Sequence, residues 1–317
     1  MELLKLIEGI RTPLLDTIIG LITRLGEEEL IIVAICIVYW CINKMFAYKT
    51  GIIFFLSGLT VQSAKFTFRI ERPWVLDPSF NPVDGAMERA TGYSFPSGHT
   101  QAGAAFYGSL GAHFKKIYLK VIFIAIVILI AFSRMYLGVH TLMDVLTSVI
   151  LTLILVFITY KLFPSDVQKD QKLFRKKLLG VSLFIILYAV AGVIYATILY
   201  SNGTIEQAYV VDYLKSAGAA VGFAVAMYIE SIYIKFSVKT KNIGMQVVKV
   251  VIGIVGVGLI LEGLKLIIGS SMVTDTFRYF LLLMWVMAIY PLIIKRFFSI
   301  PEENLPEETT KQEDGQE

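Results

Sequence analysis

Two polar residues at the start of an apolar stretch carry the strongest chemical signal in this chain. His140 and Asp144 are four residues apart, so a helix would place them on one face. An acid inside an apolar helix is ordinarily paired, and a ring N–H of His140 is the expected partner. That pairing would fix the imidazole tautomer and leave the other ring nitrogen free as a nucleophile. The alternative is a structural His–Asp pair that holds a bend.

Basic residues and a helix start give a second signal, which indicates an anion-binding site. Lys65 and Arg72 are seven residues apart, two turns along one helical face, and a proline after Arg72 would end that helix. Ser97 would cap the next helix, Gly98 lets a ligand approach the backbone, and His99 can exchange a proton near neutral pH. Free N–H groups at a helix start bind anions. Taken singly, these segments also fit snorkelling cations and an ordinary helix cap.

Together these groups match the needs of phosphoryl transfer. The equatorial oxygens of a transferring phosphoryl group suit three cations and nearby backbone amides, here supplied by Lys65, Arg72 and Arg134 with the helix start at Gly98. One histidine would attack phosphorus and the other would protonate the leaving oxygen. Because the cations already supply positive charge, we expect no metal and no other cofactor.

The composition indicates that a membrane protein positions these residues. Of 317 residues, 56% are hydrophobic and 17% are charged, whereas soluble proteins have about 45–50% and about 25%. We predict an all-α, polytopic bundle of about nine spans, with an amphipathic helix over residues 12–25 in the membrane interface. The predicted spans are residues 29–48, 50–70, 98–113, 118–138, 140–162, 178–200, 213–236, 246–269 and 276–297.

The distribution of basic residues predicts which ends of the spans lie together. Lysines and arginines collect in alternate loops, which we assign to the cytoplasmic side. The opposite side then receives all of the motif residues, so we expect a site on the outer face of a bacterial plasma membrane. The positive charges are scattered between apolar runs, which argues against nucleic-acid binding.

The motif residues resemble the three signature blocks of the type 2 phosphatidate phosphatase superfamily. The resemblance rests on Lys65-x6-Arg72-Pro73, Pro96-Ser97-Gly98-His99 and Ser133-Arg134-x5-His140-x3-Asp144, and it covers about residues 10–162. It implies an all-α membrane bundle and an enzyme that works without metal. It also implies that His140 is a nucleophile that becomes phosphohistidine, that Asp144 orients it and that His99 is the general acid. The residues that would hold the phosphate are Lys65, Arg72, Ser97, Gly98 and Arg134.

The motifs are confined to the first half of the chain. We therefore predict a phosphatase core over residues 1–162, a basic cytoplasmic linker over 163–177, additional transmembrane helices over 178–298 and an acidic disordered tail over 299–317. The additional helices bring the number of spans closer to that of the glucose-6-phosphatases, which belong to the same superfamily. For Glu262 and Lys265, three residues apart in an apolar span, we expect a structural salt bridge.

The predicted activity is hydrolysis of a phosphomonoester or pyrophosphate on a lipid. Candidate substrates are phosphatidate, phosphatidylglycerol phosphate and polyprenyl pyrophosphate, and we expect no obligate protein partner. A lipid phosphotransferase that passes the phosphoryl group to another alcohol is one alternative, and a sugar-phosphate phosphatase is another. A channel or transporter is a third, but it would carry charges at mid-depth on several spans and would not need paired histidines.

Overall fold

The described part of the chain, residues 1–88 and 90–298 of a computed structural model, is helical and contains no strand, which confirms the predicted all-α class. The elements of the first half are α1 (Glu2–Glu8), α2 (Pro13–Arg24), α3 (Glu28–Cys41), α4 (Lys44–Phe68), α5 (Pro73–Leu76), α6 (Gly98–His113), α7 (Ile117–Tyr136), α8 (Leu142–Leu162) and the short 3-10 helix η1 (Val167–Lys169). The elements of the second half are α9 (Gln171–Ser201), α10 (Gln207–Ile229), η2 (Glu230–Ile234), α11 (Ile243–Gly258), η3 (Leu259–Gly263), α12 (Leu264–Ile268), α13 (Met272–Met284), η4 (Trp285–Ile289) and α14 (Tyr290–Phe297), where η2, η3 and η4 are π-helical turns. The predicted tail, residues 299–317, lies outside the described residues.

Within the described residues, seven segments are long and apolar enough to cross a membrane. They are Lys44–Leu76, Ile117–Tyr136, Leu142–Leu162, Gln171–Ser201, Gln207–Ile234, Ile243–Ile268 and Met272–Phe297. The two other helices of the predicted spans, α3 and α6, have 14 and 16 residues, fewer than the roughly 20 that a span requires. The chain is a membrane protein, and the number of nine spans stays a prediction.

Two predicted boundaries differ from the structure, and a helix cap explains each. The break between the first two predicted spans lies at Asn43 rather than near residue 49, because the Asn43 side chain caps α4 by accepting a hydrogen bond (2.9 Å) from an amide three residues on. The predicted linker over 163–177 is shorter, because Asp170 caps α9 in the same way (2.9 Å) and the helix begins at Gln171.

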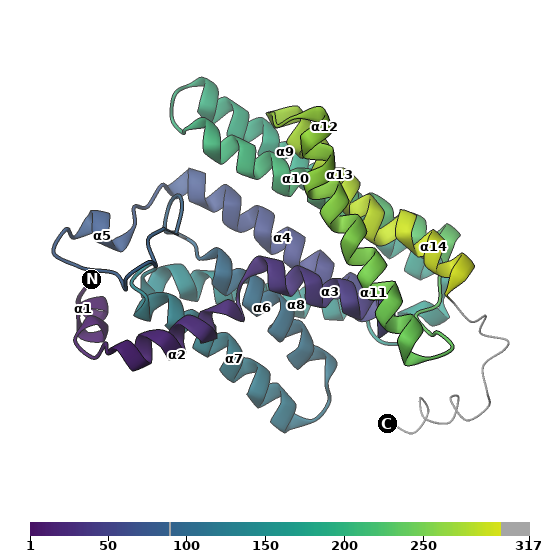
Figure 1. The fold of residues 1–317 in the computed structure, drawn as a ribbon, viewed down its shortest axis with the longest axis horizontal. Helices are drawn as coiled ribbons and strands as arrows, with labels where there is room; N and C mark the ends of the chain where they lie inside the picture. The colour runs from purple at the N-terminus through teal and green to yellow at the C-terminus, as the bar shows by residue number, and fades with distance from the viewer. Residues whose placement is uncertain (89, 299–317) are drawn as a thin grey trace.

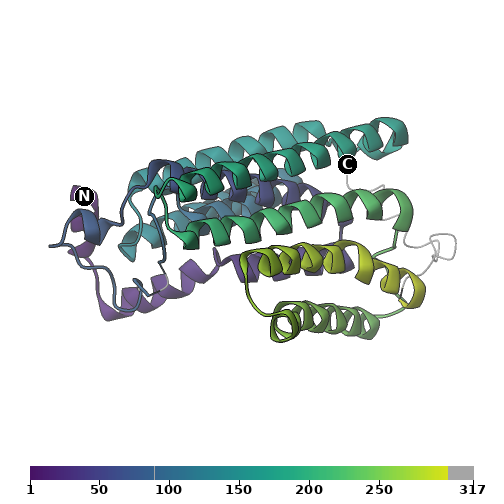
Figure 2. The same cartoon turned by 90° about the horizontal axis from the view of Figure 1, so that it is seen from above.

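Most of the longer helices run along the long axis of the molecule, so their ends gather at two opposite ends (Figure 1; Figure 2). One end holds α1, α5 and the loop that leads into α6. Helix α4 is central, because it packs against α6 and α8 of the first half and against α10 of the second half. Helix α10 in turn packs against α9 and α13. The two halves of the chain are therefore in direct contact, and their division into domains stays a prediction.

Two buried aromatic residues attach α3 to the second half of the chain. The Tyr39 hydroxyl donates a hydrogen bond to the Met287 carbonyl, and the Trp40 indole N–H donates one to the Val286 carbonyl, both at 2.9 Å. Both carbonyls belong to the π-helical turn η4. Because no water is available inside a bilayer, these bonds satisfy polar groups that would otherwise be costly to bury.

At the end of the molecule opposite α1, a fully buried carboxylate joins α4 to the end of α10. Glu230 accepts hydrogen bonds from the Lys44 ammonium and from the Phe236 backbone N–H, both at 3.1 Å, and from the Tyr48 hydroxyl. Lys44 also donates to the Phe236 carbonyl at 2.6 Å. The charge is therefore paired, as expected for an acid in an apolar span.

The predicted salt bridge between Glu262 and Lys265 is wrong. Both residues are exposed, and the described residues contain no ion pair between them. Glu262 lies in the π-helical turn η3, whose wider turn changes the spacing on which an i,i+3 pair depends.

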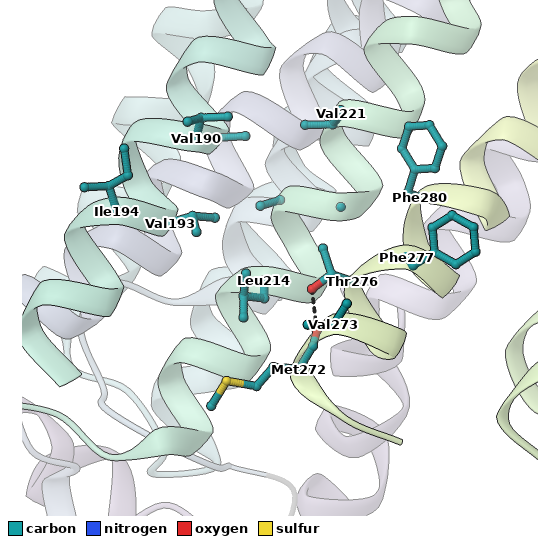
Figure 3. A pocket seen from close by; sticks show the side chains of 13 residues that line it. Val190, Val193, Ile194, Leu214, Val221, Met272, Val273, Thr276, Phe277 and Phe280 are labelled. Atoms are coloured by element: carbon teal, nitrogen blue, oxygen red, sulfur yellow. Dashed lines mark hydrogen bonds between the residues drawn. The ribbon is translucent and has the colours of Figure 1, made fainter. Parts of the chain in front are cut away.

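An apolar groove of about 500 Å³ lies between α9, α10 and α13 (Figure 3). Val190, Leu214 and Phe277 are among the side chains that line it, one from each helix. The face of α10 that meets α4 is a different one, since Tyr213 of α10 packs its ring against Phe66 of α4, with ring centroids 5.4 Å apart. The groove is thus separate from the motif residues described next.

Candidate active site

The end of α4, the start of α6 and the turn before α8 meet at the end of the molecule that holds α1 and α5 (Figure 1). Helix α4 ends at Phe68, and Arg69 adopts a left-handed conformation with φ of 52°. Three residues later Arg72 precedes Pro73, whose fixed φ suits the first position of α5. This reversal of the chain brings Arg72 back against the loop before α6 and the turn before α8.

Arg72 is held by backbone carbonyls on three sides. Its Nε donates to the Gly92 carbonyl (2.8 Å), its Nη2 to the Thr91 carbonyl (2.7 Å) and its Nη1 to the Val139 carbonyl (2.8 Å). The side chain is buried, and Nη1 also lies 3.2 Å from His140 Nε2. The guanidinium is therefore fixed in contact with the imidazole that the sequence singled out.

Asp144 organises the other side of that imidazole. Asp144 Oδ2 lies 3.4 Å from His140 Nδ1, as the four-residue spacing predicts, and both residues are buried. The same carboxylate accepts a hydrogen bond from the Ser94 hydroxyl (2.6 Å) and one from the Thr141 backbone N–H (2.7 Å). The Thr141 bond is half of a capping box that starts α8.

The hydrogen-bond partners assign the tautomer of His140. A guanidinium has donors and no acceptor, so the nitrogen facing Arg72 must carry a lone pair. The proton then lies on Nδ1, facing Asp144. Burial lowers the pKa of His140 well below its ordinary value, an effect that Arg72 and Arg134 add to and Asp144 opposes. The neutral imidazole therefore presents Nε2 with its lone pair toward Arg72.

The start of α6 is joined directly to this group. The Ser97 side chain caps α6 by accepting from the Thr100 amide (3.4 Å), and the Ser97 backbone N–H donates to the Asp144 carbonyl (3.2 Å). Gly98 and His99 follow in the first turn of α6. Burial lowers the pKa of the His99 ring, and the charges of Arg134, Lys65 and Arg72 lower it further. The charges of Arg72 and Arg134 also act on His140, so both imidazoles lie near these two cations.

Two of the predicted cations have bonding capacity to spare. Arg134 is buried and its Nη1 donates to the Thr23 hydroxyl (2.9 Å), while its buried Nε has no hydrogen-bond partner among the described residues. Among the described residues, the Lys65 ammonium makes no ion pair within 4 Å. The charges of Arg72 and Arg134, and of the acids Glu28 and Asp212, act on it. Cations that face one another with unused donors suit an anion.

Sequence reasoning missed two residues of this site. Ser94 binds the Asp144 carboxylate, and Thr23 of α2 holds the Arg134 guanidinium. Ser94 lies only three residues before the predicted cap at Ser97, which is the one sequence signal that points to it. Nothing in the sequence around Thr23 marks it, because its contact with Arg134 joins residues 111 positions apart.

Comparison with known proteins places the predicted site residues within a known family. Residues 46–168 match the model of the PAP2 superfamily, and residues 214–302 match that of a PAP2 superfamily phosphatase transmembrane extension. Phosphatidylglycerophosphatase B of Bacillus subtilis (strain 168) is 30% identical over 162 residues, which are 47% of this chain and 75% of that protein.

The chain belongs to the PAP2 superfamily. A second PAP2 relative, sphingosine-1-phosphate phosphatase 2 of Mus musculus, is 29% identical over 143 residues, 43% of this chain and 39% of that protein. The crystal structure of LpxE from Aquifex aeolicus is 27% identical and covers 50% of this chain and 93% of that one, with a TM-score of 0.45. The predicted resemblance is thereby confirmed, and every site residue predicted from the sequence lies within the matched residues 46–168.

Proposed function

We propose that the protein is an integral membrane phosphatase that hydrolyses a lipid phosphate through a phosphohistidine on His140. The observation that carries the proposal is the contact of His140 with both Arg72 and Asp144. Arg72 faces the nitrogen with the lone pair and Asp144 faces the nitrogen with the proton. The names of the relatives, a phosphatidylglycerophosphatase and a sphingosine-1-phosphate phosphatase, support a lipid substrate.

In the first step His140 Nε2 attacks phosphorus, and the bond from phosphorus to the ester oxygen breaks. The negative charge of the bound phosphate offsets the cations and favours the protonated form of His99. His99 then donates a proton to that oxygen, so the lipid leaves as a neutral alcohol. Arg72 exchanges its contact with Nε2 for a phosphate oxygen, and the free Arg134 Nε and Lys65 ammonium bind the others. Asp144 stabilises the positive charge that develops on the imidazole.

In the second step water attacks the phosphohistidine. His99, now without its proton, takes one proton from the water, and the bond from phosphorus to Nε2 breaks. Inorganic phosphate leaves, and His140 returns to the neutral tautomer. The three cations supply the positive charge that the phosphoryl group needs, so the proposal includes no metal.

We place the site on the outer face of a bacterial plasma membrane. The support is the charge distribution, since the start of α4 at Lys44 and the basic first turns of α9 lie toward the end of the molecule away from the motif residues. A lipid phosphate would reach the site at the level of the headgroups, because the motif residues sit at the ends of apolar helices.

The test is release of phosphate from lipid phosphates by the purified protein. We expect release by the wild type, inhibition by vanadate, which mimics the transition state, and activity that survives a chelator. His140→Ala should abolish turnover, because the covalent intermediate cannot form. Near-normal turnover by that variant would overturn the proposal, and transfer of the label to an added alcohol without release of phosphate would indicate a phosphotransferase instead.

A further inference from the structure

The turn between α2 and α3 packs directly on the start of α6. A Cβ built on Gly26 would lie 2.9 Å from the His99 carbonyl oxygen and 2.7 Å from Ile130 Cγ2, so a side chain at this position would collide. The Gly26 Cα in turn lies 3.8 Å from a Cβ built on Gly103 of α6. Only a residue without a side chain permits this approach, and the approach fixes where α3 begins relative to His99.

The first residue of α3 consequently reaches the candidate site. The Glu28 Oε1 lies 3.4 Å from a Cβ built on Gly98, the residue between the Ser97 cap and His99. The Lys65 ammonium and the Glu28 carboxyl group interact electrostatically. Glu28 nevertheless forms no ion pair within 4 Å among the described residues, and it is exposed. Although the residue as a whole is exposed, burial raises the pKa of its carboxyl group, and the charge of Lys65 opposes that shift. The carboxyl group therefore lies beside Gly98 and near Lys65, at the edge of the group of cations.

This position gives the carboxylate a defined relation to the substrate. His99 is the proposed donor of a proton to the leaving oxygen, so a group beside Gly98 and His99 faces the alcohol part of the substrate. A carboxylate accepts hydrogen bonds and repels negative charge. It favours an alcohol that carries a hydroxyl or ammonium near the ester oxygen, and it disfavours a second phosphate in that place.

We propose that Glu28 is a specificity residue that selects phosphomonoesters of hydroxyl- or ammonium-bearing lipid alcohols over lipid pyrophosphates. The inference rests on the proposed function and narrows its substrate. Among the candidates from the sequence, phosphatidylglycerol phosphate has a free hydroxyl beside the ester carbon, whereas phosphatidate has none. When polyprenyl pyrophosphate is the substrate, the leaving group is polyprenyl phosphate, an anion that would face Glu28.

The competing explanation is that Glu28 acts only on the protein. An acid in the first turn of α3 interacts favourably with the helix dipole, and its charge also acts on Lys65. Either effect would change catalysis equally for every substrate, because neither depends on the alcohol. A change in the ratio between substrates therefore separates the two explanations.

The experiment compares kcat/KM for phosphatidylglycerol phosphate, phosphatidate and farnesyl pyrophosphate in the wild type, Glu28→Gln and Glu29→Gln. Glu29 is the matched control, because it is an exposed acid of the same helical turn and lies about 100° around the helix. The wild type should prefer the three substrates in the order given. Glu28→Gln keeps an acceptor oxygen but removes the negative charge. It should therefore lose about 10-fold on phosphatidylglycerol phosphate, the difference between a hydrogen bond to a charged acceptor and one to a neutral acceptor, and should gain on farnesyl pyrophosphate. Glu29→Gln should keep the wild-type ratios.

The retained or improved pyrophosphate activity shows that Glu28→Gln is folded. Ratios between substrates that stay at wild-type values in Glu28→Gln would overturn the assignment, whether all activities fall together or none changes. Failure of the proposed function gives a different result, either no phosphate release by the wild type from any of the three lipids or full activity in His140→Ala. A wild type that releases no phosphate from any of the three lipids would overturn the assignment of Glu28 as well.

Discussion

Replacing Ser94 by alanine tests whether the Asp144 carboxylate must be held in place for catalysis. The carboxylate has three neighbours: the Ser94 hydroxyl at 2.6 Å, the Thr141 amide at 2.7 Å and His140 Nδ1 at 3.4 Å. Ser94→Ala removes the shortest of these contacts and leaves the other two. Because Ser94 and Asp144 are both buried, water cannot readily replace the lost donor.

The expected magnitude follows from the type of bond. A hydrogen bond to a charged group contributes about 1.5–3 kcal/mol, and about 1.4 kcal/mol corresponds to a factor of 10 in rate. If the bond orients Asp144 fully in the transition state, kcat should fall about 10- to 100-fold. KM should change little, because Ser94 lies behind the imidazole and has no contact with the proposed phosphate position.

The assay is phosphate release from phosphatidylglycerol phosphate under saturating and limiting substrate. Ser148→Ala is the matched control, since that hydroxyl is also buried and donates to the Asp144 backbone carbonyl (3.0 Å) rather than to its carboxylate. We expect the control to keep kcat within about threefold of the wild type, because it leaves every bond to the carboxylate intact. A kcat within twofold of wild type in Ser94→Ala, or an equal loss in both variants, would refute the reasoning.

Three further predictions concern other parts of the site. Arg72→Lys should lower kcat/KM at least about 100-fold, because an ammonium cannot bond three carbonyls and an imidazole at once, and activity within tenfold of wild type would contradict this. Gly26→Ala should destabilise the protein by about 1–3 kcal/mol and reduce turnover, because its Cβ would meet His99 and Ile130, whereas unchanged thermal unfolding would refute the close packing of α3 on α6. Because burial lowers the pKa of His140 and the neutral imidazole is the reactive form, activity should persist as pH falls through 6.5, and the acid limb of kcat/KM should have its midpoint below that value; a midpoint above 6.5 would contradict a buried neutral His140.

The sequence predicted local pairings within the site better than the contacts that surround them. His140 and Asp144 could be paired because a four-residue spacing on a helix is a local property, and the same holds for the Ser97 cap. The three cations Lys65, Arg72 and Arg134 were predicted from the residues, and the resemblance to the superfamily then implied that they hold the phosphate. The break at Asn43 was missed because predicted spans were drawn from hydropathy, which does not register a capping side chain.

The supporting contacts could not be predicted in the same way. Ser94 and Thr23 are hydroxyl residues of a common type, and each meets its partner only through the tertiary arrangement of distant segments. In the sequence Glu28 is one of three consecutive acids, and its place beside Gly98 depends on the packing of Gly26 against α6. The π-helical turns could not be predicted from the sequence either. One of them contains Glu262 and changes its spacing from Lys265, the expected partner.

The most direct test of the phosphohistidine is to trap it. Rapid mixing of the wild type with lipid substrate labelled on the phosphate, followed by quenching in alkali, should give a labelled protein whose phosphate is lost in acid. His140→Ala should give no labelled protein. Label retained in His140→Ala, or wild-type turnover that proceeds without any labelled protein, would contradict attack by His140.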